Sequence, residues 1–309
     1  MKPFGIYIHF PFCRTRCGYC DFPSAASSRI PQRRFTGALL QELERRAGEV
    51  GGAPLGSIYL GGGTPSLWRA EGVGAVIAAA LARFPAADPG VEVTLEMNPG
   101  DLSSARLGAL GQAGVNRLSI GVQVLDDAIL ATLGRRHTAR DARDTVEAAR
   151  RRGFRNVSCD LMFGFPGQGV AHHLAQLRDL LDLGPDHVST YALSLSPRSA
   201  LYRERGWREA DPDLLAASLD AGRELLERRG LAQYEVSNFA RPARRARHNL
   251  TYWRCAPYLG LGPHAHSMIP RGERNRRGCN ASTAAYLAGE QTTWEVVQPE
   301  SARFESMFL

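Results

Sequence analysis

Short runs of apolar, β-branched residues alternate with longer amphipathic stretches along most of the chain. The apolar runs predict strands at residues 5–10, 57–60, 91–96, 117–122, 156–162 and 187–193. The amphipathic stretches predict helices at residues 32–50, 71–84, 103–113, 139–152, 172–183 and 211–229. Strand then helix, six times over, indicates a parallel α/β sheet with right-handed crossovers. Six units are too few for a closed (β/α)8 barrel, so we predict an open partial (β/α)6 barrel of the TIM type, with a doubly wound sheet as the alternative.

We assign residues 1–235 to this barrel and residues 236–309 to a C-terminal extension. The last stretch, PESARFESMFL, reads as the opening of a helix, with Phe304, Met307 and Phe308 at core spacing. A helix rarely begins an apolar face and stops within a turn or two, because tertiary packing supplies most of its stability. We therefore expect that the chain is truncated before a small helical domain, or that this domain has been lost.

Composition narrows the class of protein. A hydrophobic content of 44% in 309 residues supports a sizeable core. We see neither an apolar run of about 20 residues nor a signal peptide. Six cysteines, three of them clustered, fit a reducing compartment. We expect a cytoplasmic protein, with a peripheral position at the inner face of the membrane as a second option. The net charge of +7 is spread along helical segments, so we interpret it as solvated surface and do not expect a nucleic-acid partner.

Three cysteines lie close together near the amino terminus, as Cys13, Cys17 and Cys20 in HFPFCRTRCGYCDF. Three thiolates at this spacing can hold three irons of a [4Fe–4S] cluster. Such clusters normally take four cysteines, so one iron would stay open to a substrate or cofactor. The alternatives are a disulfide, or a zinc site that takes His9 as its fourth ligand.

Polar residues follow or end every predicted strand. The cysteines follow the first strand and Gly61-Gly62-Gly63-Thr64-Pro65 follows the second, while Glu96, Gln123, Asp160 and Tyr191 lie at or near the ends of the other four. Active sites of barrels form at the carboxyl ends of their strands. The sequence therefore predicts one site to which all six strands contribute.

The cysteine loop, with Tyr19 just before the third cysteine, resembles that of the radical S-adenosylmethionine (SAM) superfamily. The resemblance implies an open partial barrel, a [4Fe–4S] cluster on Cys13, Cys17 and Cys20, and SAM bound at the open iron. It also implies which residues contact SAM. By this resemblance, the methionyl amine would contact Gly62, Gly63, Thr64 and Glu96, and the methionyl carboxylate would contact Arg135. The ribose hydroxyls would contact Gln123 and Asp160, and the adenine would contact Tyr19. Tyr7 would point from the first strand toward the opening of the same site.

Within the superfamily, segments such as YLGGGTPS, NRLSIGVQ and CDLMFGFPGQ resemble the oxygen-independent coproporphyrinogen III oxidase-like group. True oxidases carry a fourth cysteine where this chain has Phe22. The haem chaperone branch, the HemW family, has Asp-Phe there and carries His-Asn-x-x-Tyr-Trp, present as His248, Asn249, Tyr252 and Trp253. We therefore favour a haem chaperone over a coproporphyrinogen III oxidase, and leave open whether the protein is an enzyme.

That resemblance implies haem as a ligand, a haem-accepting membrane protein of respiration as a partner, and a reductase or flavodoxin-type electron donor. A histidine nitrogen can ligate haem iron, and aromatic rings can pack on the porphyrin. The arginines Arg244, Arg245 and Arg247 could pair with propionates, and His264 and His266 are further candidate ligands. The alternative is structural: Tyr252 and Trp253 close the open edge of the barrel while His248 is a buried hydrogen-bonding residue.

Overall fold

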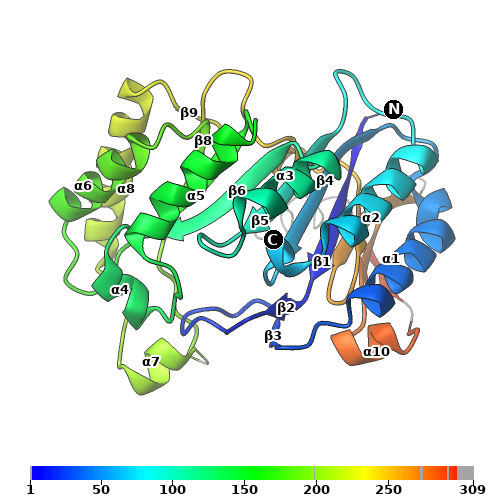
Figure 1. Ribbon diagram of the computed structural model, residues 1–309, viewed down its shortest axis with the longest axis horizontal. Helices are drawn as coiled ribbons and strands as arrows, with labels where there is room; N and C mark the ends of the chain where they lie inside the picture. The colour runs from blue at the N-terminus through cyan, green and yellow to red at the C-terminus, as the bar shows by residue number, and fades with distance from the viewer. Residues whose placement is uncertain (1, 198, 272–273, 291, 298–309) are drawn as a thin grey trace.

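A computed structural model describes residues 2–197, 199–271, 274–290 and 292–297 of the protein. At its centre, six parallel strands alternate with helices (Figure 1). The strands are β1 (Phe4–Phe10), β4 (Leu55–Gly62), β5 (Glu92–Met97), β6 (Arg117–Gln123), β7 (Val157–Phe163) and β8 (His187–Ala192). The helices are α1 (Gln32–Arg46), α2 (Ala70–Arg83), α3 (Ser104–Gln112), α5 (Ala139–Arg151), α6 (Val170–Leu181) and α8 (Pro212–Arg228). The prediction of an open TIM-type partial barrel is confirmed.

Both ends of each predicted element agree with the structure to within two residues, once the 3-10 turn η1 (Ala47–Val50) is joined to α1. Capping explains several of these ends. The Thr138 side chain accepts from the backbone N–H of Asp141, whose carboxylate accepts from the N–H of Thr138, so α5 begins in a complete capping box. The Asp211 side chain caps α8, and Pro212 occupies its first turn.

The two faces of the parallel sheet differ in chemistry, and β6 shows the pattern clearly. Leu118, Ile120 and Val122 are fully buried in the apolar core. That core also contains the inner faces of the surrounding helices, which form one layer outside the sheet. The alternate β6 residues Arg117 and Ser119 line the interior of the barrel instead. Because side chains of a strand alternate between its two faces, one strand fills the apolar layer and also supplies polar groups to the interior.

Strand register sets the interior side chains in neighbouring rows. The pairs Tyr7–Tyr59, Glu96–Ser119 and Asp160–Ser189 join β1 to β4, β5 to β6 and β7 to β8. Paired residues on hydrogen-bonded strands lie about 5 Å apart. Residues far apart in the sequence therefore meet on one concave surface.

The sheet extends beyond the six predicted strands at both edges, to twelve strands in all among the described residues. On one side β11 (Tyr258–Leu261) adds a seventh parallel strand next to β1, and the antiparallel strands β12 (His266–Arg271), β13 (Arg274–Cys279) and β14 (Thr293–Val297) follow it. On the other side, β10 (Asn238–Ala240) pairs antiparallel with β8, and β9 (Ala232–Gln233) completes the sheet. The domain boundary at residue 235 stays a prediction.

A buried arginine fastens this extension to the first helix. Arg46, at the end of α1, donates to Glu42 at 2.8 Å, to the Gly260 carbonyl at 2.7 Å and to Ser267 Oγ at 2.9 Å. It also donates to Glu49 at 3.2 Å. The guanidinium is therefore fully engaged, as a buried charge needs to be.

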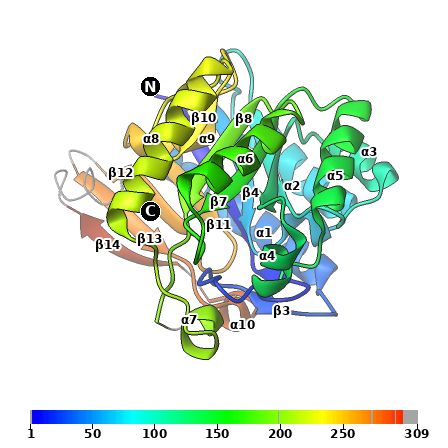
Figure 2. The same ribbon diagram turned by 90° about the vertical axis from the view of Figure 1, so that its left-hand side faces the viewer.

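Short elements gather at the carboxyl ends of the strands (Figures 1 and 2). These are β2 (Phe12–Cys13), β3 (Ala25–Ala26), the turn η2 (Pro65–Leu67), α4 (Asp127–Thr132), α7 (Ala200–Glu204) and α10 (Thr283–Leu287). Helix α9 (Arg247–Trp253) lies toward the opposite end (Figure 2). Among the described residues, no helix combines the length and hydropathy that crossing a bilayer requires. Phe304, Met307 and Phe308, expected to open a last helix, lie outside the described residues.

Candidate functional site

The cysteine loop is held at both ends and in the middle. Pairing of β2 with β3 sets Cys13 beside Ala26 and closes the ends of the loop. At its centre, the Gly18 N–H donates to the Leu133 carbonyl at 3.0 Å, and the Leu201 N–H donates to the Gly18 carbonyl at 3.0 Å. These backbone bonds anchor the loop to α4 and α7, so its conformation is fixed by the barrel rather than by local sequence.

Cys13, Cys17 and Cys20 are free thiols that line a single cavity. Burial raises the pKa of Cys20, and the neighbouring thiols Cys17 and Cys13 raise it further. The three thiols thus line the same cavity wall and influence one another electrostatically. Positive charge from bound iron would favour the thiolate forms that ligation requires.

His9, the fourth ligand of the alternative zinc site, is engaged in other contacts. Both ring nitrogens of His9 have partners elsewhere: Nδ1 lies 3.0 Å from the Tyr7 hydroxyl, and Nε2 lies 2.8 Å from the Pro23 carbonyl. Among the described residues, no three His, Cys, Asp or Glu side chains converge closely enough to hold a single metal ion. In this arrangement His9 is therefore not placed as a fourth ligand for the three thiols.

The glycine run after β4 allows the cysteine loop to approach. A Cβ on Gly63 would lie 2.6 Å from the Phe12 carbonyl oxygen and 2.9 Å from that of Phe10. The backbone N–H of Gly63 donates to the Phe10 carbonyl at 2.7 Å, and that of Thr64 donates to the Phe12 carbonyl at 2.9 Å. Side chains are thus excluded because two backbone segments touch, and this contact positions the loop beside Gly62, Gly63 and Thr64.

Glu96 is the carboxylate of this wall. It accepts from the Tyr59 hydroxyl at 2.7 Å and from the Gly62 backbone N–H at 3.2 Å. Burial raises its pKa to about 7, although the bond from Tyr59 opposes this rise. A carboxylate with two fixed donors and an open side toward a cavity suits a cationic amine.

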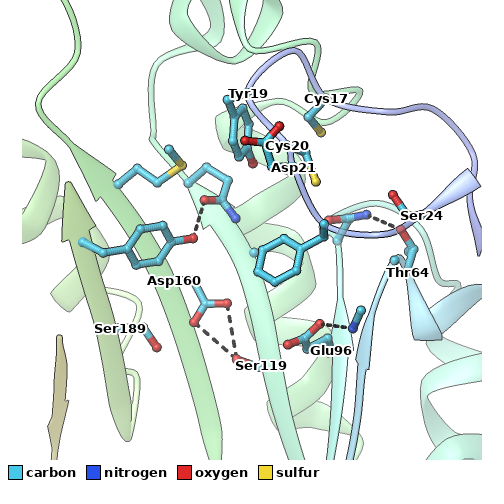
Figure 3. A pocket seen from close by; sticks show the side chains of 18 of the residues that line it. Cys17, Tyr19, Cys20, Asp21, Ser24, Thr64, Glu96, Ser119, Asp160 and Ser189 are labelled. Carbon is cyan, nitrogen blue, oxygen red and sulfur yellow. Dashed lines mark hydrogen bonds between the residues drawn. The ribbon is translucent and has the colours of Figure 1, made fainter. Parts of the chain in front are cut away.

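On the opposite wall, Asp160 accepts from Ser119 Oγ at 3.3 Å, and the Tyr191 hydroxyl donates to Gln123 at 3.0 Å. Figure 3 shows Asp160 with Ser119 and Ser189, across the cavity from the cysteine loop. Burial raises the pKa of Asp160, and the bonds from Ser189 and Ser119 oppose this rise. Gln123 has a φ of 67°, a strained position for a residue with a side chain.

Arg135 connects the cysteine loop to the barrel. Its guanidinium donates to Asn98 at 2.6 Å and to the Gly121 carbonyl at 2.7 Å, and it lies 3.6 Å from Cys17 Sγ. It also lies beside the Tyr19 hydroxyl, where its charge lowers a pKa that burial raises. A permanent positive charge is thus fixed next to one of the three thiols.

All of the predicted cofactor residues line one cavity of about 980 Å³. They are Tyr7, Cys13, Cys17, Tyr19, Cys20, Gly62, Gly63, Thr64, Glu96, Gln123, Arg135 and Asp160. Sequence reasoning missed several further lining residues, namely Tyr59, Asn98, Arg117, Ser119 and Ser189. Strict alternation of polar and apolar residues along the strands was the signal that could have found four of these. That the predicted residues contact SAM stays a prediction.

The His-Asn-x-x-Tyr-Trp segment forms α9, and of its four named residues only Asn249 lines the cavity. His248 is buried behind it, with Nδ1 2.9 Å from Ser57 Oγ and Nε2 2.9 Å from the Tyr252 hydroxyl. Its ring stacks on Tyr59 at 5.1 Å between centroids. Neither nitrogen is available to iron in this arrangement. Haem contact by His248, Tyr252 and Trp253 stays a prediction, and ligation by His248 would require its hydrogen bonds to open.

The comparisons with known proteins agree with what the geometry of the cavity indicates about the class of protein. Residues 7–181 match the radical SAM superfamily. The chain is 45% identical to the bovine (Bos taurus) protein named radical S-adenosyl methionine domain-containing protein 1, mitochondrial, over 87% of this chain and 61% of that relative. It is 35% identical to the heme chaperone HemW of Haemophilus influenzae, over 100% of this chain and 82% of that protein. The chain thus spans about three fifths of the length of its bovine relative.

Solved structures support the fold. The coproporphyrinogen III oxidase HemN of Escherichia coli superposes with a TM-score of 0.79, at 21% identity, over 96% of this chain and 72% of that one. At this identity the likeness speaks for the fold alone. The sequence relationship carries the classification: the chain belongs to the radical SAM superfamily and, within it, to the HemW family.

Proposed function

We propose that this protein is a radical SAM haem chaperone, which binds haem and transfers it to haem-dependent respiratory proteins. The observation that carries the proposal is the relationship to the HemW of Haemophilus influenzae along the whole chain, joined to a cavity that contains every predicted cofactor residue. The relatives named heme chaperone also include proteins of Escherichia coli and Bacillus subtilis, each 37% identical to this chain.

In this proposal Cys13, Cys17 and Cys20 hold a [4Fe–4S] cluster. When bound, the cluster supplies an electron and an iron coordination site for SAM. The protein's own groups then bind and orient SAM. Glu96, which lines the cavity, would face the methionyl amine, and Asp160 and Gln123 would face the ribose. Arg135, which lies 3.6 Å from Cys17 Sγ, would hold its positive charge beside the methionyl carboxylate.

We further propose a haem-accepting membrane protein as the recipient and a reductase or flavodoxin-type protein as the electron donor. Delivery to a membrane protein would bring the chain to the inner face of the membrane as a peripheral protein. These partners follow from the chaperone proposal, and evidence against that proposal is also evidence against them.

The second candidate is oxidative decarboxylation of coproporphyrinogen III, suggested by segments such as YLGGGTPS and NRLSIGVQ, which resemble the group that contains this oxidase. Against it stands Phe22, at the position where the resemblance implies a fourth cysteine. Its side chain lines the cavity and is 65% exposed. A phenyl ring offers neither a thiolate nor a proton donor there, whereas an exposed aromatic surface beside a cavity suits contact with a flat apolar ligand.

Two measurements on anaerobically reconstituted protein test the proposal. Haem titration followed by Soret absorbance should give saturable binding, and the loaded protein should pass haem to an apo-haemoprotein. Incubation with coproporphyrinogen III, SAM and a strong reductant should give no protoporphyrinogen, since the chain has Phe22 in place of the extra cysteine. Formation of vinyl product would establish the oxidase instead, and absence of haem binding would remove the chaperone.

A further inference from the structure

Arg117 is a buried cation whose hydrogen-bonding groups are largely unused. It is the first residue of β6, and its side chain is 2% exposed. Among the residues that the structure describes, a single hydrogen bond engages the guanidinium, from Nη1 to Thr94 Oγ1 at 3.4 Å. Nε is buried without any partner. Among the described residues, no carboxylate oxygen lies within 4.0 Å of Arg117 nitrogen in an ion pair.

Arg46, another buried arginine, shows the hydrogen bonding that a structural role requires. Arg46 bonds to two carboxylates, a carbonyl and a hydroxyl, so that every part of its guanidinium is engaged. A guanidinium has five N–H donors, and burying it unpaired costs several kcal/mol. Arg117 retains most of its donors although its side chain is buried. The difference indicates that Arg117 is arranged for a partner that is not part of the chain.

The position of Arg117 says where such a partner would lie. Arg117 precedes Ser119 by two residues on β6, so both side chains point into the barrel, and Arg117 lies one row farther from the cysteine loop. Figure 3 shows Ser119, Asp160 and Ser189 on the side of the cavity away from that loop. Arg117 lines the same cavity, together with Asn249 of α9. It therefore forms part of the floor, beneath the residues that face SAM.

The charge of the cavity agrees with an anionic ligand at this floor. Glu96 and Asp160 are carboxylates of the same interior, and the charge of Arg117 lowers the pKa of each, although neither bonds to it. Their ammonium and hydroxyl partners are supplied by SAM in the proposed function. Arg117 is then the cation without an assigned partner.

We propose that Arg117 forms an anion-binding subsite at the floor of the cavity, which takes a carboxylate of a bound ligand. The inference rests on the proposed function, in which haem supplies carboxylates through its two propionates, whereas the methionyl carboxylate of SAM is assigned to Arg135 beside the cysteine loop. Arg is suited to this role because its planar fork binds a carboxylate through two parallel N–H···O bonds.

The test compares haem, haem dimethyl ester and SAM as ligands of the reconstituted wild type and of Arg117→Gln. Esterification removes both propionate charges but keeps the porphyrin. If the subsite takes a propionate, the wild type binds haem about 10- to 100-fold more tightly than the ester, and Arg117→Gln binds both equally. The variant should bind SAM with wild-type affinity, because Arg135 faces the methionyl carboxylate. A variant that loses SAM affinity and keeps the wild-type preference for haem over the ester overturns the propionate subsite.

Arg140→Gln is the matched control, because it removes the same charge from a guanidinium whose side chain is 89% exposed. Arg117→Lys, which keeps the charge, should recover part of the lost affinity. A folded Arg117→Gln protein with unchanged binding of all three ligands overturns the subsite. So does a wild type that binds haem and its ester with equal affinity. If the wild type binds neither porphyrin, the chaperone proposal fails and the subsite fails with it, whereas equal binding of the two porphyrins overturns the subsite alone.

Discussion

The protonation of Glu96 should control the affinity for SAM near neutral pH. Burial raises the pKa of Glu96 to about 7, and only the ionised carboxylate can pair with the methionyl ammonium. With that pKa, about one carboxyl in ten is ionised at pH 6 and about three in four at pH 7.5. SAM affinity of the wild type should therefore rise about eightfold between these two pH values. The range stops below pH 8 because an α-amino group itself titrates there.

Two variants isolate this effect. In Glu96→Gln the pH dependence should be flat, and affinity at pH 7.5 should fall about 10- to 100-fold, as expected for loss of a charge-assisted contact. In Tyr59→Phe the carboxylate remains, but it loses the hydroxyl that donates at 2.7 Å and lowers its pKa. The midpoint of the pH dependence should then move to higher pH.

The free protein should respond to pH in the opposite sense. Because Glu96 holds its proton more tightly in the folded than in the unfolded chain, the unfolding free energy that it contributes falls as pH rises from 4.5 toward 7. The loss is at most about 3 kcal/mol, and less where water in the cavity screens the charge. Glu96→Gln should therefore be more stable than the wild type above neutrality, when SAM is absent.

The assay is SAM titration of the anaerobically reduced protein, followed by the EPR spectrum of its cluster at both pH values. Urea unfolding in the same buffers gives the stability. A wild-type SAM affinity that does not change between pH 6 and pH 7.5 would refute the role given to Glu96. So would a Glu96→Gln variant that keeps the wild-type pH slope.

Three further substitutions test the packing around the site. Gly63→Ala sets a Cβ 2.6 Å from the Phe12 carbonyl oxygen, so it should displace the cysteine loop and lower the iron content after reconstitution. Gly37→Ala is the control, because a Cβ there has nothing within 4 Å. This variant should keep the wild-type iron content and gain up to about 1 kcal/mol of helix stability. His248→Ala should lower the unfolding free energy in urea by about 2–4 kcal/mol, since it leaves the Ser57 and Tyr252 hydroxyls without their partner, and it should leave the haem spectrum unchanged. An unchanged stability together with a lost haem spectrum would identify His248 as a ligand. Substitution of the exposed His172 by Ala is the control. Arg46→Ala should lower the free energy of unfolding by about 3–5 kcal/mol, because it leaves the buried Glu42 carboxylate without its ion-pair partner. A decrease below about 1 kcal/mol in thermal unfolding would contradict a structural role of Arg46.

Much of the fold could be predicted from the sequence because the patterns that indicate its strands and helices are local. Each βα unit contains an apolar strand followed by a helix whose apolar face repeats with the helical period, and caps such as Thr138 and Asp211 mark the helix starts. That the predicted cofactor residues line one cavity could be foreseen for a related reason. Parallel strands all point their carboxyl ends the same way, so residues such as Thr64 and Asp160 must meet once the strands are placed in one sheet.

The outer strands and the orientation of α9 were not accessible in this way. Strands β9 and β10 have two and three residues, too few to show a period. The arginine-rich strand β13 lacks the apolar alternation that usually indicates a strand. For α9, seven residues cannot show which side faces the cavity, and long-range contacts decide it: the Glu92 carboxylate accepts from the backbone N–H of Arg247 at 2.9 Å, and Ser57 fixes His248. Such partners, far apart in the sequence, leave no local pattern.

The polar interior explains how this barrel can bind a ligand without losing its stability. Barrels of the TIM type usually fill their centre with layers of Val, Ile and Leu, whereas here the centre contains Glu96, Asp160, Arg117 and the hydrogen-bonded ring of His248. The apolar layer between sheet and helices therefore supplies most of the stability. Because the interior contributes little apolar burial, its charges can be arranged for ligands, and their incomplete pairing, as in Arg117, identifies where those ligands are needed.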